Sequence, residues 1–213
     1  MKGVRFGNYH SYNDFGLILS QKTIGTPSPK TETINIPGGD GVLDLTEFFG
    51  EVKYNNRELS FEFSTMVPQA EFMNLFSRVQ NALHGQKMNI ILDDDSEWQY
   101  TGRIEVSEWK AEKAIGKLTI DCDCEPYKTK PADTVIIQAV NGTEKTVILP
   151  NGRKSVVPLI DIAGNVDLTF GTNFWALSEG RYELPAVRLA NGDNIVLLNG
   201  TGTATFTYKE WGL

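Results

Sequence analysis

Side chains that build catalytic and metal centres are scarce in this sequence. Of its 213 residues, two are histidine and two are cysteine. The zinc motif His-Glu-x-x-His, the nucleophile motif Gly-x-Ser-x-Gly and the phosphate-binding loop Gly-x-x-x-x-Gly-Lys-Ser/Thr are all absent. The carboxylates of Asp40 and Asp44 are close in sequence, but they flank a glycine-rich turn, and acid–base chemistry needs a rigid cleft. We therefore expect no enzyme activity, no cofactor and no bound metal.

Long apolar runs and an excess of basic charge are also missing. No stretch of about 18 apolar residues occurs, so we expect no membrane span. The first residues lack the apolar core of a secretory signal, so we expect the chain to stay in the cytoplasm where it is made. The formal net charge of −7 argues against stable nucleic-acid binding through a basic face.

The two cysteines and an acidic run are the remaining features that suggest metal binding. Cys122 and Cys124 alternate with Asp121 and Asp123, which predicts a strand with both thiols buried on one face. Neighbours two apart in a strand are poorly placed for a disulfide, and no further ligands with zinc-like spacing follow. The run 93–97 (Asp-Asp-Asp-Ser-Glu) lacks the spacing of a calcium loop, so we interpret it as a solvated turn.

The first half of the chain reads as mainly β with one α-helix. Leu59, Phe61 and Phe63 alternate with polar residues, which indicates a half-buried strand. Residues 68–84 predict the helix, with Pro68 in its first turn and one apolar stripe formed by Phe72, Leu75, Phe76, Val79 and Leu83. Further strands are predicted over residues 88–92, 100–106 and 114–124, and a strand, a turn and a strand over residues 4–20.

Residues 34–57 combine turn-forming glycine and proline residues with several apolar side chains. Gly38, Gly39 and Gly41 surround Asp40 and permit a tight reversal. Pro37 removes a ladder donor, so the strand over residues 33–36 should stop there or lie at an edge. Apolar residues follow the turn at Val42, Leu43, Leu45, Phe48 and Phe49. A bent arm with an apolar side suits docking against another surface better than holding a small substrate.

Beyond a linker at residues 128–133, the sequence predicts a second, all-β domain. Short strands alternate with turn dipeptides, as in a compact antiparallel β-sandwich. The predicted turns are Asn141-Gly142, Asn151-Gly152, Gly164-Asn165, Asn191-Gly192 and Asn199-Gly200. The strands are predicted over residues 135–140, 145–149, 156–162, 166–170, 186–189, 195–198 and 203–211. Phe174, Trp175, Tyr182 and Trp211 offer aromatic faces for a sugar, but packing in the sandwich core is the simpler interpretation.

Several motifs in a fixed order carry a resemblance to a known family. The pattern Ile-Pro-Gly-x-Asp-Gly-x-x-Asp-Leu-Thr begins at Ile36 and is followed by Gly50 and by Tyr-x-Asn-Arg at residues 54–57. After the predicted helix come His84-Gly85, an apolar strand, the acidic turn, Trp98, Tyr100, Gly102-Arg103 and the closing step Pro126-Tyr127. In this combination the chain resembles the distal tail proteins of long-tailed phages.

The resemblance implies a fold, an assembly and a set of partners. It implies an N-terminal ring-forming α+β domain over residues 1–130 and a C-terminal galectin-like sandwich over residues 131–213. It implies a homohexamer at the virion tail tip, between the tail tube protein and a tail-associated lysin or fibre protein, with a receptor-binding protein as a further partner. The arm is then the expected subunit interface, formed by Ile34, Ile36, Gly38, Gly39, Asp40, Gly41, Leu43, Asp44, Leu45, Phe48, Phe49 and Arg57. A carbohydrate-binding module that recognises host-surface glycans is the alternative function.

Overall fold

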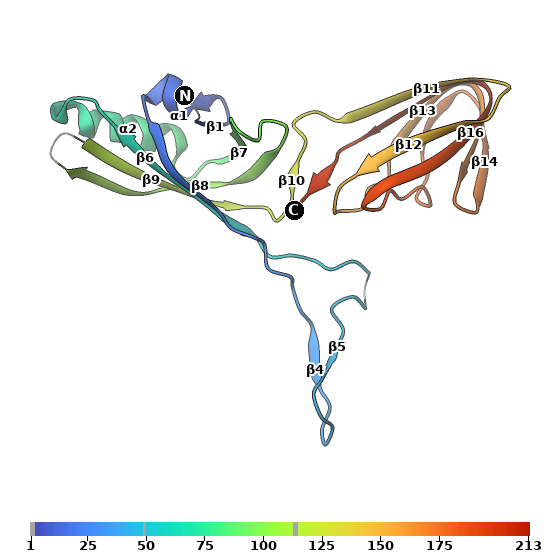
Figure 1. Ribbon diagram of the computed structural model, residues 1–213, viewed down its shortest axis with the longest axis horizontal. Coiled ribbons are helices and arrows are strands. Elements are labelled where there is room, and N and C mark those ends of the chain that lie inside the picture. Colours follow the sequence, from blue (N-terminus) through green and yellow to red (C-terminus); the bar gives the residue numbers. More distant parts are fainter. Residues whose placement is uncertain (1–2, 49, 113–114) are drawn as a thin grey trace. The chain divides into compact units, whose positions relative to one another are not determined.

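The computed structural model describes residues 3–48, 50–112 and 115–213. Contacts divide the chain into two compact units, Met1–Pro126 and Tyr127–Leu213 (Figure 1). The sequence placed its domain boundary at residue 130. The chain is mainly antiparallel β-structure with one long helix, as predicted.

The first unit is built on one antiparallel sheet whose strands pair in the order β2-β1-β7-β8-β9-β6-β3. The strands are β1 (Val4–Phe6), β2 (Tyr9–His10), β3 (Ile18–Ile24), β6 (Arg57–Thr65), β7 (Lys87–Leu92), β8 (Gln99–Glu112) and β9 (Ile115–Cys124). The helical segments are α1 (Ser11–Phe15), the 3₁₀ turn η1 (Gln69–Glu71) and α2 (Phe72–Leu83). Ala114, the first residue of one predicted strand, lies outside the described residues. None of the described helices is long and apolar enough to cross a membrane.

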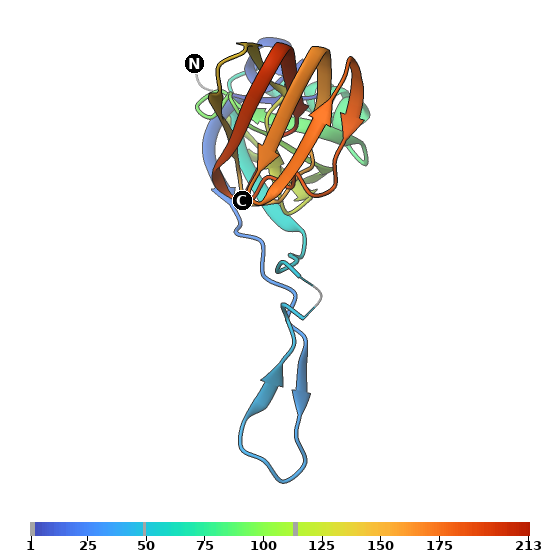
Figure 2. The same ribbon diagram turned by 90° about the vertical axis from the view of Figure 1, so that its right-hand side faces the viewer.

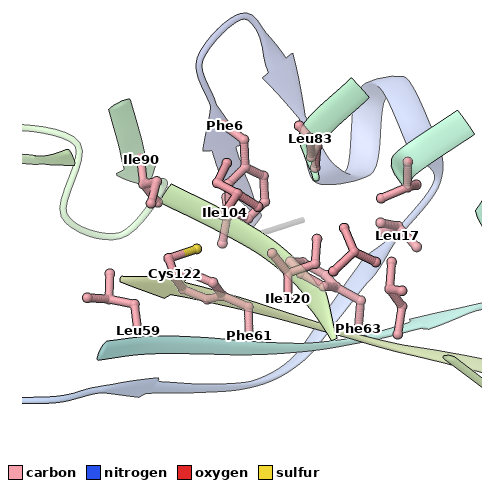
Figure 3. Close-up of a cluster of buried hydrophobic side chains, with 14 of the residues drawn as sticks. Phe6, Leu17, Leu59, Phe61, Phe63, Leu83, Ile90, Ile104, Ile120 and Cys122 are labelled. Atoms are coloured by element: carbon pink, nitrogen blue, oxygen red, sulfur yellow. The ribbon is translucent and has the colours of Figure 1, made fainter. Parts of the chain in front are cut away.

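The core of this unit lies on the face of the sheet to which Leu59, Phe61 and Phe63 point (Figure 3). All three side chains are fully buried, and Phe61 stands opposite Ile120 on β9. Phe6 packs edge-on against Phe61, with the ring centroids 5.8 Å apart. Truncating an aromatic ring in such a core costs about 3–5 kcal/mol. The alternation read from the sequence therefore identified the inward face of β6.

The predicted helix and the predicted cysteine strand both form, but the α-helix spans Phe72–Leu83 and not 68–84, because Pro68 precedes the 3₁₀ turn η1 and is not in the first turn of α2. The apolar stripe of α2 is buried at Phe72, Leu75, Val79 and Leu83. Cys122 and Cys124 are buried free thiols on β9. Burial raises the pKa of Cys124 to about 12, so this thiol stays protonated and unreactive at neutral pH.

The N-terminal segment differs from its prediction, because α1 separates the two expected strands. His10 Nδ1 accepts the backbone N–H groups of Tyr12 and Asn13, each at 3.1 Å, and so caps this helix. The other ring nitrogen, Nε2, lies 3.1 Å from the Asp93 carboxylate. Histidine is not among the favoured N-cap residues, so the sequence rules did not reveal this helix start. The acidic turn is exposed as predicted, but Asp93 also anchors the N-terminal segment to the end of β7.

The second unit is an antiparallel sheet in the path order β11-β16-β13-β14, with β12 also on β16 and β15 also on β13. The strands of this sheet are β11 (Thr134–Asn141), β12 (Lys145–Asn151), β13 (Leu159–Phe170), β14 (Asn173–Leu177), β15 (Gly180–Glu183) and β16 (Gly192–Tyr208). The unit also contains β10 (Lys128–Thr129) and β17 (Trp211–Gly212), which pair with each other outside this sheet. Two predicted turns were wrong, because Gly164-Asn165 lies inside β13 and Asn199-Gly200 lies inside β16. Residues 186–189 form no strand beyond an isolated bridge between Val156 and Leu189.

The two misread dipeptides lie side by side at a crease in this sheet. Gly164 and Gly200 have φ angles of 93° and 100°, and Gly164 stands opposite Gly202 in the register of β13 and β16. A Cβ on Gly202 would lie 2.3 Å from the carbonyl oxygen of Ala163. Only glycine allows the close approach at Gly202 and the positive φ at Gly164 and Gly200. The two dipeptides therefore bend continuous strands instead of ending them.

The crease divides the sheet into two layers that enclose one core. β11 and β15 flank one end of the long pair β13–β16, and β12 and β14 flank the other end. In β13 and β16, even-numbered side chains point inward on both sides of the crease. One core cluster contains Ile160 and Phe206 from one layer with Leu168 and Val196 from the other. This arrangement is the expected antiparallel sandwich, made by folding one sheet.

We predict that Gly202→Ala destabilises the second unit. The new methyl group meets a backbone carbonyl that has no rotamer with which to yield, so the free energy of unfolding should fall by about 1–3 kcal/mol. Urea unfolding followed by tryptophan fluorescence measures the change. Gly39→Ala is the matched control, because its added Cβ would meet no atom closer than 3.4 Å. Equal midpoints for the two variants would show that the crease tolerates a side chain.

Candidate assembly interface

Between β3 and β6 the chain forms an arm, residues 26–56, which is hydrogen-bonded along its own length. At its base the Asn55 N–H donates to Ser28 O at 2.9 Å, and the Lys30 N–H donates to Lys53 O at 2.7 Å. Further along, β4 (Thr33–Asn35) pairs with β5 (Val42–Asp44) in a separate two-stranded sheet. Figure 2 shows these two strands side by side. The described residues of the arm therefore form a hydrogen-bonded hairpin without a core of its own.

The turn of the hairpin follows from its proline and glycines. β4 ends at Asn35, ahead of Pro37, as the missing ladder donor predicted. Gly38 and Gly41 have φ angles of 78° and 76°. Gly39, also expected to serve the reversal, has no positive φ. The turn thus fixes the register in which Ile34 stands opposite Leu43.

This register sorts the arm's side chains onto two unlike faces. Ile34 and Leu43 are a cross-strand pair, and alternation places Ile36 and Leu45 on the same side. The opposite side carries Thr33, Asn35, Val42 and Asp44. Ile34, Ile36 and Leu43 are 49%, 51% and 47% exposed, respectively. We call Ile34, Ile36, Leu43 and Leu45 the apolar face of the arm.

Asp44 and Thr46 make their hydrogen bonds within the arm itself. Thr46 donates its backbone N–H to Asp44 Oδ1 at 2.8 Å. The hydrogen bonds from the Thr46 hydroxyl and N–H hold the pKa of Asp44 below its usual value. Thr46 Oγ1 also accepts the Glu32 N–H at 3.1 Å. Asp44 therefore stabilises the hairpin, and Asp40 is an exposed residue of the turn.

The expected interface also includes Phe48, Phe49 and Arg57. Phe48 follows the hairpin and is 71% exposed, whereas Phe49 lies outside the described residues. The remaining member, Arg57, does not belong with the exposed set, because only 7% of it is accessible.

Arg57 instead fixes the base of the arm within its own unit. Its Nε donates to Gly25 O at 2.9 Å, and its Nη1 donates to Pro126 O at 3.4 Å. The guanidinium carbon lies 5.1 Å from the centroid of the Tyr100 ring. The motif that contains Arg57 was recognised in the sequence, but periodicity alone did not reveal that its charge is satisfied internally.

A groove of about 630 Å³ crosses the polar face of the first sheet, lined in part by Glu58, Ser60, Glu105, Asp121 and Asp123. Two of its carboxylates accept hydrogen bonds from neighbouring side chains: Asp121 from the Ser60 hydroxyl at 2.6 Å, and Asp123 from Asn56 Nδ2 at 3.0 Å. Among the residues that the structure describes, no group of three or more His, Cys, Asp or Glu side chains is placed to hold a metal.

The aromatic residues considered for sugar stacking do not form one platform. Trp175 and Tyr182 pack against the core of the second unit. Trp211 lies under Lys154, whose Nζ is 3.9 Å from the ring centroid. Phe174 is 62% exposed. The interpretation of these residues as packing groups therefore holds for Trp175 and Tyr182, and Phe174 faces solvent.

These features define a class of protein: a two-unit antiparallel β protein that presents an ordered hairpin with an unpartnered apolar face. The chain is similar to the crystal structure of the Dit protein (gp 19.1) of phage SPP1, with a TM-score of 0.68 and 14% sequence identity. The match covers 98% of this chain and 99% of that chain. That protein is described as a paradigm of the hub adsorption apparatus in phages that infect Gram-positive bacteria. No family model and no curated protein matches the sequence.

The structural match confirms the Dit fold that the sequence motifs led us to expect. It extends over both units, although the motifs quoted from the sequence come almost entirely from the first unit.

We predict that Arg57→Met destabilises the first unit without changing its surface. Loss of a charged donor leaves the partly buried carbonyl oxygens of Gly25 and Pro126 without it, so the free energy of unfolding should fall by about 2 kcal/mol. Arg78→Met is the control, because Arg78 is exposed and its hydrogen bond, to Asp14 O at 3.2 Å, lies at the surface. Chemical unfolding compares the two variants; equal effects would contradict a special role for the buried guanidinium.

Proposed function

We propose that this chain is a structural hub protein of the tail tip of a long-tailed phage or prophage, and that it acts without catalysis. In this role it forms a homohexameric ring that joins the tail tube to the tail-tip lysin or fibre protein and to the receptor-binding apparatus. The observation that carries the proposal is the Dit fold across nearly the whole chain. The exposed apolar face of the arm supports it, because an assembly gives such a face a partner.

The arm is the proposed contact between neighbouring subunits of the ring. A ring has heterologous interfaces, in which one surface of a subunit meets a different surface of the next. Full burial of a large aliphatic side chain contributes about 1.5–3 kcal/mol, so each half-exposed residue of the apolar face retains roughly half of that for binding. Six repeats of such a contact close the ring cooperatively.

The other parts of the proposal concern the surroundings of the ring. The tail tube protein contacts one face, and the lysin or fibre protein contacts the other. The negative net charge of the chain is compatible with DNA passing through the ring without stable binding, because like charges repel. The protein then resides at the virion tail tip after synthesis in the host cytoplasm.

We predict that aspartate on the apolar face of the arm prevents ring assembly. Leu43→Asp or Leu45→Asp places a carboxylate in a contact that must exclude water, which costs more than the apolar burial it replaces. Light scattering coupled to size-exclusion chromatography should then give the mass of single chains in place of hexamers.

Val42→Asp is the matched control, since Val42 is 56% exposed and lies on the opposite face of the same hairpin. Its rings should persist. Hexamers that survive both leucine substitutions would refute the role of the arm, and a wild-type chain that never forms rings, with or without tail tube protein, would refute the hub function.

A further inference from the structure

The second unit has its own unpartnered apolar surface, on the outside of the layer β12–β16–β13–β14. Ile148 on β12 and Ile195 on β16 are 52% and 57% exposed. Their chain neighbours Val147, Leu149 and Val196 are buried, so strand alternation directs the two isoleucines outward. Phe174 on β14 is the third large exposed group of this layer.

The strand register makes these side chains contiguous. Ile148 stands directly opposite Ile195. Leu197, two residues beyond Ile195 on β16, belongs to a row that crosses all four strands. In this row Leu197 stands opposite Thr146 on one side and Thr169 on the other, and Thr169 stands opposite Phe174. Residues directly opposite in antiparallel strands have Cβ atoms about 5 Å apart and diagonal neighbours about 7–8 Å apart, so the row and the isoleucine pair are adjacent on the same face. We define the outer sheet face as Thr146, Ile148, Thr169, Phe174, Ile195 and Leu197.

Two carboxylates stand at opposite ends of this face. Asp193 precedes Ile195 by two residues on β16 and lies opposite Pro150. Asp167 precedes Thr169 by two residues on β13 and lies opposite Asn199. Neither has a hydrogen-bond or ion-pair partner among the described residues. Lys145, the basic residue of these strand segments, lies opposite the buried Leu198 and so belongs to the other side of the layer.

We propose that the outer sheet face binds a partner protein that presents apolar side chains flanked by arginine or lysine. The apolar centre and charged ends match the usual anatomy of a protein interface, in which a dry core is surrounded by a polar rim. Basic groups on the partner complement Asp167 and Asp193 and fix its orientation.

The chemistry of the face disfavours other occupants. Branched aliphatic side chains such as Ile148 and Ile195 offer no flat ring for stacking on a sugar, and Phe174 stands at the edge of the set. A second copy of the same face brings carboxylates against carboxylates. The arm of another copy carries Asp40, Asp44, Glu47 and Glu51 and is repelled in the same way.

The test is selection from a randomised hairpin-peptide library displayed on yeast, with the full-length chain as the target. Three targets are compared: the wild-type chain, Ile195→Asp on the outer sheet face, and Ile137→Asp. Ile137 is 66% exposed and lies on β11 in the other layer, so its substitution is a matched control. We expect the enriched peptides to share an apolar centre with flanking basic residues and to bind Ile195→Asp at least tenfold more weakly, with binding to Ile137→Asp unchanged.

A second measurement locates the contact directly. In the chain labelled at isoleucine methyl groups, the best peptide should shift the NMR signals of Ile148 and Ile195 and leave that of Ile137 in place. The variants Asp167→Asn and Asp193→Asn should lower the preference for basic over acidic flanks several-fold.

Several outcomes would overturn the proposal. In the selection, peptides whose enrichment does not depend on Ile195, or peptides with acidic flanks, would contradict it. Glycan-array binding that Ile195→Asp abolishes would point to a sugar as the ligand. Ile195 NMR signals that shift with the concentration of the chain itself would point to a second copy. Ring formation is measured separately by mass, so the hub function and this surface succeed or fail independently.

Discussion

The antiparallel pairing of β3 with β6 is the constraint on which the arm depends. The arm leaves the sheet after Ile24 and returns at Arg57, and the pairing holds Ile24 opposite Leu59. The Gly25 N–H donates to Glu58 O at 2.8 Å, while Gly25 O accepts from Arg57. Because both ends are fixed in adjacent strands, the segment between them runs out and back as a hairpin. An apolar segment without a core is thereby kept ordered and exposed.

Apolar side chains are exposed at several places in this protein, among them Met66, Val135 and Ile137, as well as on the apolar face of the arm and on the outer sheet face. The first unit buries the aromatic residues of β6 and most of the stripe of α2, and its core includes no side chain of the arm. The second unit closes its own core between two layers. The apolar face of the arm and the outer sheet face contribute to neither core, and we propose that other proteins bury them. The proposed hub function uses the first surface, and the proposed partner contact uses the second.

The glycine crease links the fold of the second unit to its outer surface. Because Gly164, Gly200 and Gly202 bend two continuous strands, β13 and β16 serve both layers. Each layer then has an inner face, which fills the core, and an outer face whose side chains are set by the same alternation. If turns divided β13 and β16 into shorter strands, Ile195 and Phe174 would not be held in one common register.

The sequence by itself determined the features that depend on local periodicity. These include the inward face of Leu59, Phe61 and Phe63, the stripe of α2, the buried thiols and the end of β4 before Pro37. It also carried the motifs that resemble the distal tail proteins. Such patterns suffice because a strand or a helix repeats its buried face at a fixed spacing.

Only the tertiary structure decided the features that depend on partners distant in the sequence. Arg57 is buried because the carbonyl oxygens of Gly25 and Pro126 meet it there. Helix α1 begins at Ser11 because the imidazole of the preceding His10 accepts two backbone N–H groups and also contacts Asp93. Asn199-Gly200 bends a strand instead of ending it because β13 continues alongside. The two faces of the arm likewise follow from the pairing of Ile34 with Leu43, since a shift of one residue would exchange them.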